Sequence, residues 1–174
     1  MSLLLVRMFA LSLLILGITA ERGITCRQEI PVQMIRELWS RTRQLIDDLP
    51  KEEHFSRRLL PKFCTKCPER TIGWLEMRDV IDVYQRSVFS RKVVQKLLPL
   101  HYNDLLYRLQ HTLQNCVSSS EPSKWSKTIK KLERKIKKRR RDDGALKAVG
   151  EFTYVLRWID ELAHHRIYRA SVKS

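Results

Sequence analysis

The sequence lacks the short motifs by which many enzymes and ion-binding proteins are recognised. It contains no His-Glu-x-x-His, no Gly-x-Ser-x-Gly, no glycine-rich phosphate-binding loop and no EF-hand loop. It also has no internal repeat, no low-complexity tract and no pair of segments that would predict a hairpin. We therefore expect a protein that is not an enzyme and that binds no cofactor or metal ion.

Long apolar stretches are also missing, apart from one near the N-terminus. Residues 8–18 are almost continuously apolar, Arg7 precedes them, and Ala20 is the kind of small residue after which a signal peptidase cuts. The stretch is shorter than a comfortable membrane span, and no stop-transfer pattern follows it. We predict a signal peptide over residues 1–20 and a single secreted, extracellular domain over residues 21–174. An uncleaved N-terminal anchor is the alternative.

Cysteines are few, and secretion decides how they are interpreted. Four cysteines in an oxidising compartment allow two disulfides with three possible connectivities. Cys64 and Cys67 have the spacing of a zinc half-site or a redox motif. The isolated His54, His101 and His111 offer zinc no second ligand pair, and the strand–helix–strand context of a thioredoxin-like motif is missing. A structural disulfide is therefore the favoured interpretation of this cysteine pair.

Acidic residues are outnumbered by basic ones, 19 against 34, which gives a net charge of +15. Much of the excess lies between Lys124 and Arg141, where eleven Lys or Arg residues accompany one acid, Glu133. At 100° per residue, Trp125, Ile129, Leu132 and Ile136 fall within an arc of about 60°. The segment is therefore expected to form a helix with a narrow apolar edge and a cationic back.

The cationic back predicts a polyanionic partner. Like charges four residues apart oppose helix formation, so a face kept at that cost favours a binding role over simple solubility. The candidate partners are heparan sulfate, DNA and an anionic membrane surface. A solvated face with no partner is the alternative. The residues that we expect to bind the polyanion are Lys127, Lys130, Lys131, Arg134, Lys135, Lys137, Lys138, Arg139, Arg140 and Arg141.

The last helical segment, residues 144–162, is the one around which the others are expected to pack. Its apolar residues cover an arc of about 140°, which is wider than the contact face of a two-stranded coiled coil. Lys147, Arg157, Asp160 and Glu161 lie outside this arc. The helix therefore needs neighbours on several sides, and a polar tail is expected from about residue 164.

Other segments supply these neighbours. Helical periodicity appears over residues 31–49, 72–89 and 102–116, and Ser123 is a candidate N-cap for the basic helix. Residues 51–68 predict a long connection across the bundle, in which Leu59, Leu60 and Phe63 contact the core. The expected fold class is all-α, a bundle of four main helices plus one or two short ones.

The last helix also carries a pattern of a known family. KAVGE at residues 147–151, followed by LRWI at 156–159, resembles the last-helix signature KAxGELDxLLxWI of the interleukin-10 family of class II helical cytokines. RLL at 58–60, VF at 88–89 and the Leu and Cys spacing over 109–116 agree with the same family. The chain departs from it in having Phe-Thr where the signature has Leu-Asp. It also has a single cysteine, Cys116, directly before the last two helices, where several members have two.

The resemblance implies a class II cytokine fold and a pair of disulfides. In the family, a cysteine near the mature N-terminus bonds one at the end of the helix before the basic helix, which here implies a Cys26–Cys116 bond. Cys64 and Cys67 then remain to bond each other. A different partner for one of them, or an intermolecular bond, stays open. A short connection before the last two helices favours a monomer over a domain-swapped dimer.

The resemblance further implies a secreted cytokine that assembles a heterodimeric class II cytokine receptor and signals through JAK/STAT. A cationic host-defence protein that acts on anionic bacterial membranes or binds extracellular DNA is the alternative. The family's first receptor contacts the first helix, the connection and the last helix. By their solvent-facing positions, the candidates there are Arg41, Arg43, Asp47, Lys51, Glu52, His54, Arg157, Asp160 and Glu161.

Overall fold

The computed structural model describes residues 26–50, 58–65, 67, 71–117, 122–139 and 142–164. In this part of the chain the protein is an all-α bundle, and its only β-type pairing is an isolated bridge between Cys64 and Thr71. The predicted signal peptide and most of the polar tail lie outside the described residues. The elements are α2 (Val32–Asp47), α3 (Trp74–Tyr84), the π-helix η1 (Gln85–Phe89), α4 (Lys92–Gln95), α5 (Tyr102–Cys116), α6 (Ser126–Lys138) and α7 (Asp143–His164).

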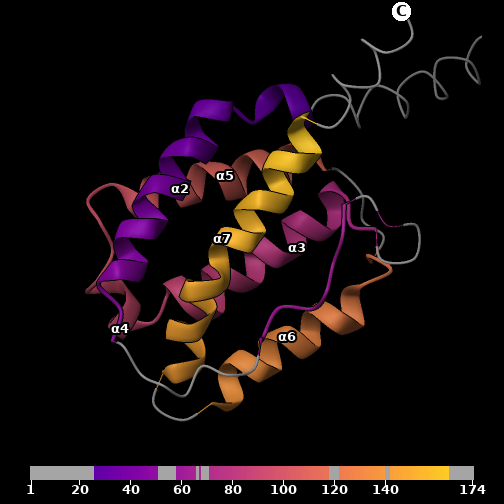
Figure 1. Cartoon of the computed structure of the whole chain (residues 1–174). Helices are drawn as coiled ribbons and strands as arrows, with labels where there is room; N and C mark the ends of the chain where they lie inside the picture. The colour runs from indigo at the N-terminus through magenta and orange to yellow at the C-terminus, as the bar shows by residue number, and fades with distance from the viewer. Residues whose placement is uncertain are drawn as a thin grey trace, which may run out of the picture.

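Helix α7 lies in the middle of the bundle, as its wide apolar arc predicts. It contacts α2, α3, η1 and α6, and α5 packs against α2 and α3 (Figure 1). Phe152 of α7 is fully buried between Tyr84 and Phe89, with ring centroids 4.9 and 5.0 Å away. Phe89 in turn contacts Tyr102 at 5.4 Å. These aromatic rings join α3, η1, α5 and α7 in one core.

The buried part of α7 is wider at its N-terminal half than the sequence predicts. Lys147 was expected outside the apolar arc, yet it is only 6% exposed. The neighbouring Leu146 and Ala148 are also buried, since α6 and the connection cover sides of the helix that a single apolar arc leaves open. A position outside the apolar arc therefore does not leave Lys147 in solvent.

The connection before α3 is fixed to α7 by a buried carboxylate. Glu151 accepts hydrogen bonds from the backbone N–H of Leu59, at 2.9 and 3.1 Å, and from that of Leu60, at 2.8 Å. Lys147, one turn earlier in α7, lies 3.7 Å from the same carboxylate. A buried charge is tolerated only when it is paired and hydrogen-bonded, and here both conditions are met. Leu59, Leu60 and Phe63 are buried, as expected for a connection that crosses the core.

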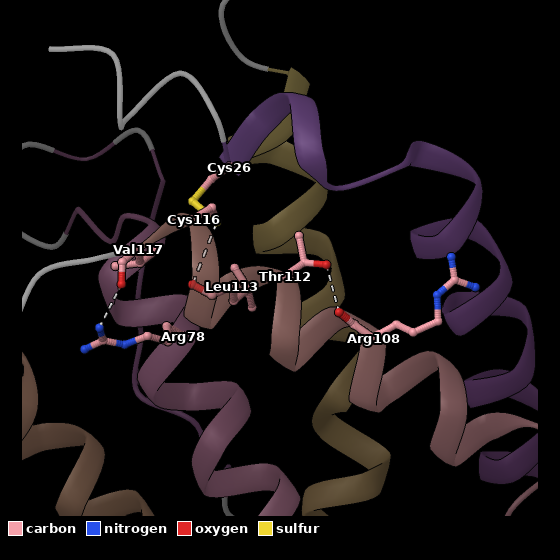
Figure 2. The surroundings of a disulfide bond; sticks show 7 residues. All are labelled: Cys26, Arg78, Arg108, Thr112, Leu113, Cys116 and Val117. Carbon is pink, nitrogen blue, oxygen red and sulfur yellow. Dashed lines mark hydrogen bonds between the residues drawn. A yellow bond between two sulfur atoms is a disulfide. The ribbon is translucent and has the colours of Figure 1, made fainter. Parts of the chain in front are cut away.

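Two disulfides join the pairs that the family resemblance implies. Cys26 bonds Cys116, which links the turn before α2 to the end of α5, and Cys64 bonds Cys67 within the connection. On the chain-entropy model, closing loops with separations of 90 and 3 residues stabilises the fold by about 4.6 and about 2 kcal/mol. Figure 2 shows the first bond beside Val117, whose carbonyl accepts a hydrogen bond of 3.2 Å from Arg78 of α3. The long-range disulfide therefore accounts for most of the stability that cross-linking gives.

Helices α6 and α7 meet at a sharp reversal that depends on a glycine. Asp142, just before α7, has a left-handed backbone with φ of 63°, which aspartate tolerates better than most residues. At Gly144 a Cβ atom would lie 2.1 Å from the backbone oxygen of Ile136 in α6. The two backbones approach so closely that only glycine fits there. Gly150, in the middle of α7, has no such neighbour within 4 Å of a Cβ position.

These two glycines give a matched pair of substitutions. Gly144→Ala is expected to lower the free energy of unfolding by about 1–3 kcal/mol, since backbone atoms must shift to admit the methyl group. Gly150→Ala is expected to raise it by about 0.5–1 kcal/mol, because alanine favours a helix interior and meets nothing there. Urea unfolding followed by circular dichroism measures both changes. A Gly144→Ala protein as stable as the wild type would contradict the close approach of α6 and α7.

Candidate functional site

Helix α6 presents the cationic face that the sequence predicts. Ile129, Leu132 and Ile136 are buried along one edge. The basic side chains on the rest of the helix project into solvent, except that Arg139, at its C-terminal end, is half-buried. Arg140 and Arg141 lie outside the described residues. The exposed members of the predicted set are Lys127, Lys130, Lys131, Arg134, Lys135, Lys137 and Lys138.

The single acid of α6 attaches this helix to the bundle. Glu133 accepts two hydrogen bonds from Arg86 of η1, at 3.0 and 3.2 Å, one from Ser87 at 3.1 Å, and one from Lys137 at 2.8 Å. The Arg86 guanidinium first, and then Lys137, lower the pKa of Glu133 to about 2. Arg86 and Ser87 are consecutive residues of the π-helix η1, and both donate to this carboxylate. Glu133 is thus ionised over the whole physiological range.

The start of α6 differs from the sequence prediction. Ser123 was expected to be the N-cap, but α6 begins at Ser126 and Trp125 occupies the cap position. The buried Ser123 hydroxyl accepts a hydrogen bond from the Trp125 N–H at 3.0 Å and donates to Glu76 of α3 at 2.9 Å. The Trp125 indole donates to the Thr71 carbonyl at 3.1 Å. Ser123 therefore bonds the backbone just before the helix and a tertiary partner, Glu76, which a local cap pattern does not indicate.

A first depression lies between α2 and α7. Its volume is about 560 Å³. Trp39 of α2 forms part of its wall, and Arg36, Arg43 and Asp160 are its charged members. Val32, Ile35 and Ser40 complete the lining. It thus combines apolar surface with two guanidinium groups and one carboxylate.

A second depression lies on the other side of the same part of α7, against the connection. Its volume is about 350 Å³, and the connection contributes Arg58, Phe63, Cys64 and Thr65. Helix α7 contributes Tyr154, Arg157, Trp158 and Glu161. The Arg58 guanidinium lies 4.6 Å from the centre of the Tyr154 ring, and Phe63 packs edge-on against Trp158 at 5.6 Å. The Thr65 hydroxyl donates to Glu161, so this carboxylate is engaged within the wall.

The structure brings together part of the predicted receptor set. Arg43 and Asp160 line the first depression, and Arg157 and Glu161 line the second. Asp47 is exposed at the end of α2. Lys51, Glu52 and His54 lie outside the described residues, so their predicted role is not placed.

Arg41 is directed away from these depressions. Its guanidinium donates to the Leu100 carbonyl and to Glu37, the latter at 2.8 Å. Residues two positions apart on a helix are rotated by about 200° around its axis, so Arg41 and Arg43 lie on nearly opposite sides of α2. Arg41 lines neither depression, and its role in receptor binding stays a prediction.

Sequence reasoning missed four residues that the depressions contain. Arg36 and Trp39 lie two turns and one turn before Arg43, respectively, on the same side of α2, and helical spacing could have indicated them. Tyr154, a large aromatic residue outside the apolar arc of α7 and 42% exposed, was a second such signal. Arg58 had no signal of its own, because only the tertiary structure brings the connection against Tyr154.

Membrane-spanning and metal-binding features were searched for in the described ranges. No helix there is both long and apolar enough to cross a membrane. Nor do three or more His, Cys, Asp or Glu side chains in those ranges come together in a group that could hold a metal ion.

Comparison with family models, with curated proteins and with solved structures finds no match to this chain. The resemblance to the interleukin-10 family therefore rests on the sequence motifs alone, and the fold stands on the coordinates.

The Glu133 pair makes the attachment of α6 pH-dependent. Its folded pKa lies below the ordinary value of 4.5, so the stabilisation is complete above about pH 4.5 and is lost as the pH falls towards 2. Glu133→Gln is expected to lower the free energy of unfolding by about 1 kcal/mol at pH 6, and the difference from the wild type should narrow progressively below pH 4.5. Urea titrations at pH 6, 4 and 3 measure this.

Glu37→Gln is the matched control for this experiment. Glu37 also forms an i,i+4 ion pair, with Arg41, but its side chain is 42% exposed whereas that of Glu133 is 16% exposed. Its variant should stay within about 0.5 kcal/mol of the wild type at each pH. If Glu133→Gln and Glu37→Gln changed the free energy of unfolding equally at each pH, Glu133 would contribute no more to stability than an exposed ion pair.

Proposed function

We propose that the protein is a secreted cytokine of the interleukin-10 family that assembles two class II cytokine receptor chains. The observation that carries the proposal is the pair of depressions on either side of the C-terminal half of α7. Their walls come from α2, the connection and α7, the same three elements through which this family engages its first receptor. No catalytic group is needed for this function, and aromatic and arginine side chains are those enriched at protein interfaces.

The charge of this surface indicates the chemistry of the receptor side. Arg36 and Arg43 outnumber Asp160 in the first depression. In the second, Arg58 and Arg157 outnumber Glu161, which Thr65 already engages. A receptor loop that presents carboxylates beside an apolar or aromatic side chain would complement both depressions.

The second element of the proposal is that α6 binds polyanions. Its cations point into solvent, and its apolar edge is occupied by the bundle, which favours attachment to a polyanion over insertion into a bilayer. None of these cations lines either depression. The two binding activities are therefore expected to be separable. Direct action on anionic bacterial membranes or extracellular DNA remains the second candidate function, supported by the same exposed cations.

Two charge-reversal variants test the receptor and polyanion surfaces together. Arg43→Glu with Arg157→Glu should weaken binding to the cognate class II receptor ectodomain by about tenfold or more, through lost complementarity at both depressions. Lys130→Glu with Arg134→Glu should leave that affinity unchanged, because α6 lies outside the depressions. A screen of the mature protein against each class II receptor ectodomain by surface plasmon resonance provides the measurement.

The opposite pattern is expected for heparin. Reversing Lys130 and Arg134 should elute the protein from heparin at markedly lower salt, whereas reversing Arg43 and Arg157 should have a smaller effect, although both variants change the net charge by the same amount. Failure of every ectodomain to bind the folded protein, together with α6-dependent leakage of anionic vesicles, would favour the host-defence function instead.

A further inference from the structure

The two disulfides differ in their accessibility to a reductant. Cys26 and Cys116 are 1% and 7% exposed. Cys67, in contrast, is exposed, and Cys64 is half-buried. Thiol–disulfide exchange begins when a thiolate reaches one of the two sulfur atoms, so its rate depends on access. A reductant in solution can therefore attack Cys67 Sγ while the bundle stays folded, whereas the Cys26–Cys116 bond is shielded.

Opening the exposed bond does not release the connection from the bundle. The Cys64 carbonyl accepts a hydrogen bond of 3.1 Å from the Ile72 N–H, and Thr71 accepts one of 3.1 Å from the Trp125 indole. Upstream, Glu151 holds the backbone of Leu59 and Leu60. Because these contacts do not involve sulfur, the chain on both sides of the disulfide stays attached after reduction. The bond itself closes a loop with a separation of only 3 residues, so losing it affects global stability much less than losing the long-range bond.

One half of the exposed disulfide, Cys64, also lines the second depression. Cys64 and Thr65 line its wall, opposite Arg157 and Trp158. The Thr65 hydroxyl donates to Glu161 of α7, so the position of residue 65 affects a charged group of the same surface. A change in the backbone freedom of residues next to the disulfide is therefore transmitted to the depression by direct contact.

We propose that Cys64–Cys67 is a redox modification site, and that its reduction by an extracellular dithiol weakens binding at the second depression. One thiolate of the dithiol attacks Cys67 Sγ, and Cys64 leaves as a thiolate, which takes up a proton. The second thiol of the reductant loses its proton and displaces Cys67 from the mixed disulfide. The net reaction converts one protein disulfide into two thiols and oxidises one dithiol to a disulfide. The effect on binding rests on the proposed receptor function, but the selective reduction does not.

Selective alkylation tests the modification site. The folded, oxidised protein is treated with increasing dithiothreitol at pH 7.4, quenched with iodoacetamide and mapped by mass spectrometry. Cys64 and Cys67 should be labelled first, and Cys26 and Cys116 at least about a hundredfold more slowly, because their exchange requires the bundle to open. Circular dichroism should show unchanged helicity in the selectively labelled protein. Simultaneous labelling of all four cysteines, or no labelling of Cys67 before helicity is lost, would overturn the proposal.

Receptor binding tests the regulatory effect on the ectodomain that binds the oxidised protein. Selectively reduced and alkylated protein should bind it about tenfold more weakly, since loop residues must then be ordered on binding. The Cys64→Ser, Cys67→Ser double variant should have the same reduced affinity and should not respond to dithiothreitol. Unchanged affinity after confirmed labelling would overturn the regulatory effect. If no ectodomain binds even the oxidised protein, the receptor function fails, while the alkylation pattern still decides the modification site.

Discussion

The fold depends on one buried carboxylate that joins the central helix to the connection crossing it. A carboxylate as deeply buried as that of Glu151 would destabilise the fold by several kcal/mol if it had no partners. Glu151 has three partners: the N–H of Leu59, the N–H of Leu60 and the ammonium group of Lys147. Two of these are backbone groups that the irregular connection could not otherwise satisfy. The contact therefore provides partners for both the buried carboxylate and the backbone N–H groups, and it fixes where the connection passes over α7.

The functional surfaces follow from that placement. With the connection held against α7, Arg58 comes to lie over Tyr154, and Thr65 comes to lie beside Glu161. Helix α2 packs on another side of α7, and the first depression forms there. The same helix thus supplies part of the wall of both depressions. A partner that grips this region would contact elements from the beginning, the middle and the end of the chain.

In helix α6, contacts with the rest of the bundle offset the repulsion among its own basic side chains. Its like charges oppose helix formation, and its apolar edge contains only three buried residues in the described structure, Ile129, Leu132 and Ile136. Glu133 compensates by accepting hydrogen bonds from Arg86, Ser87 and Lys137. Gly144 then lets α7 begin in direct contact with the backbone of α6. The basic residues remain in solvent because the attachment uses the one acid of the helix and not its cations.

The sequence by itself determined the helical class, the positions of the main helices, the central place of α7 and the cationic face of α6. Each of these depends on the periodicity of apolar or charged residues along a helix, which is a local property of the chain. Only the tertiary structure decided that Lys147 is buried, that Ser123 bonds Glu76, that Arg41 bonds the Leu100 carbonyl, and that Arg58 meets Tyr154. These features depend on which neighbour covers a given side of a helix. Contacts between residues 47 to 96 positions apart in the chain cannot be read from the spacing of residues within one turn.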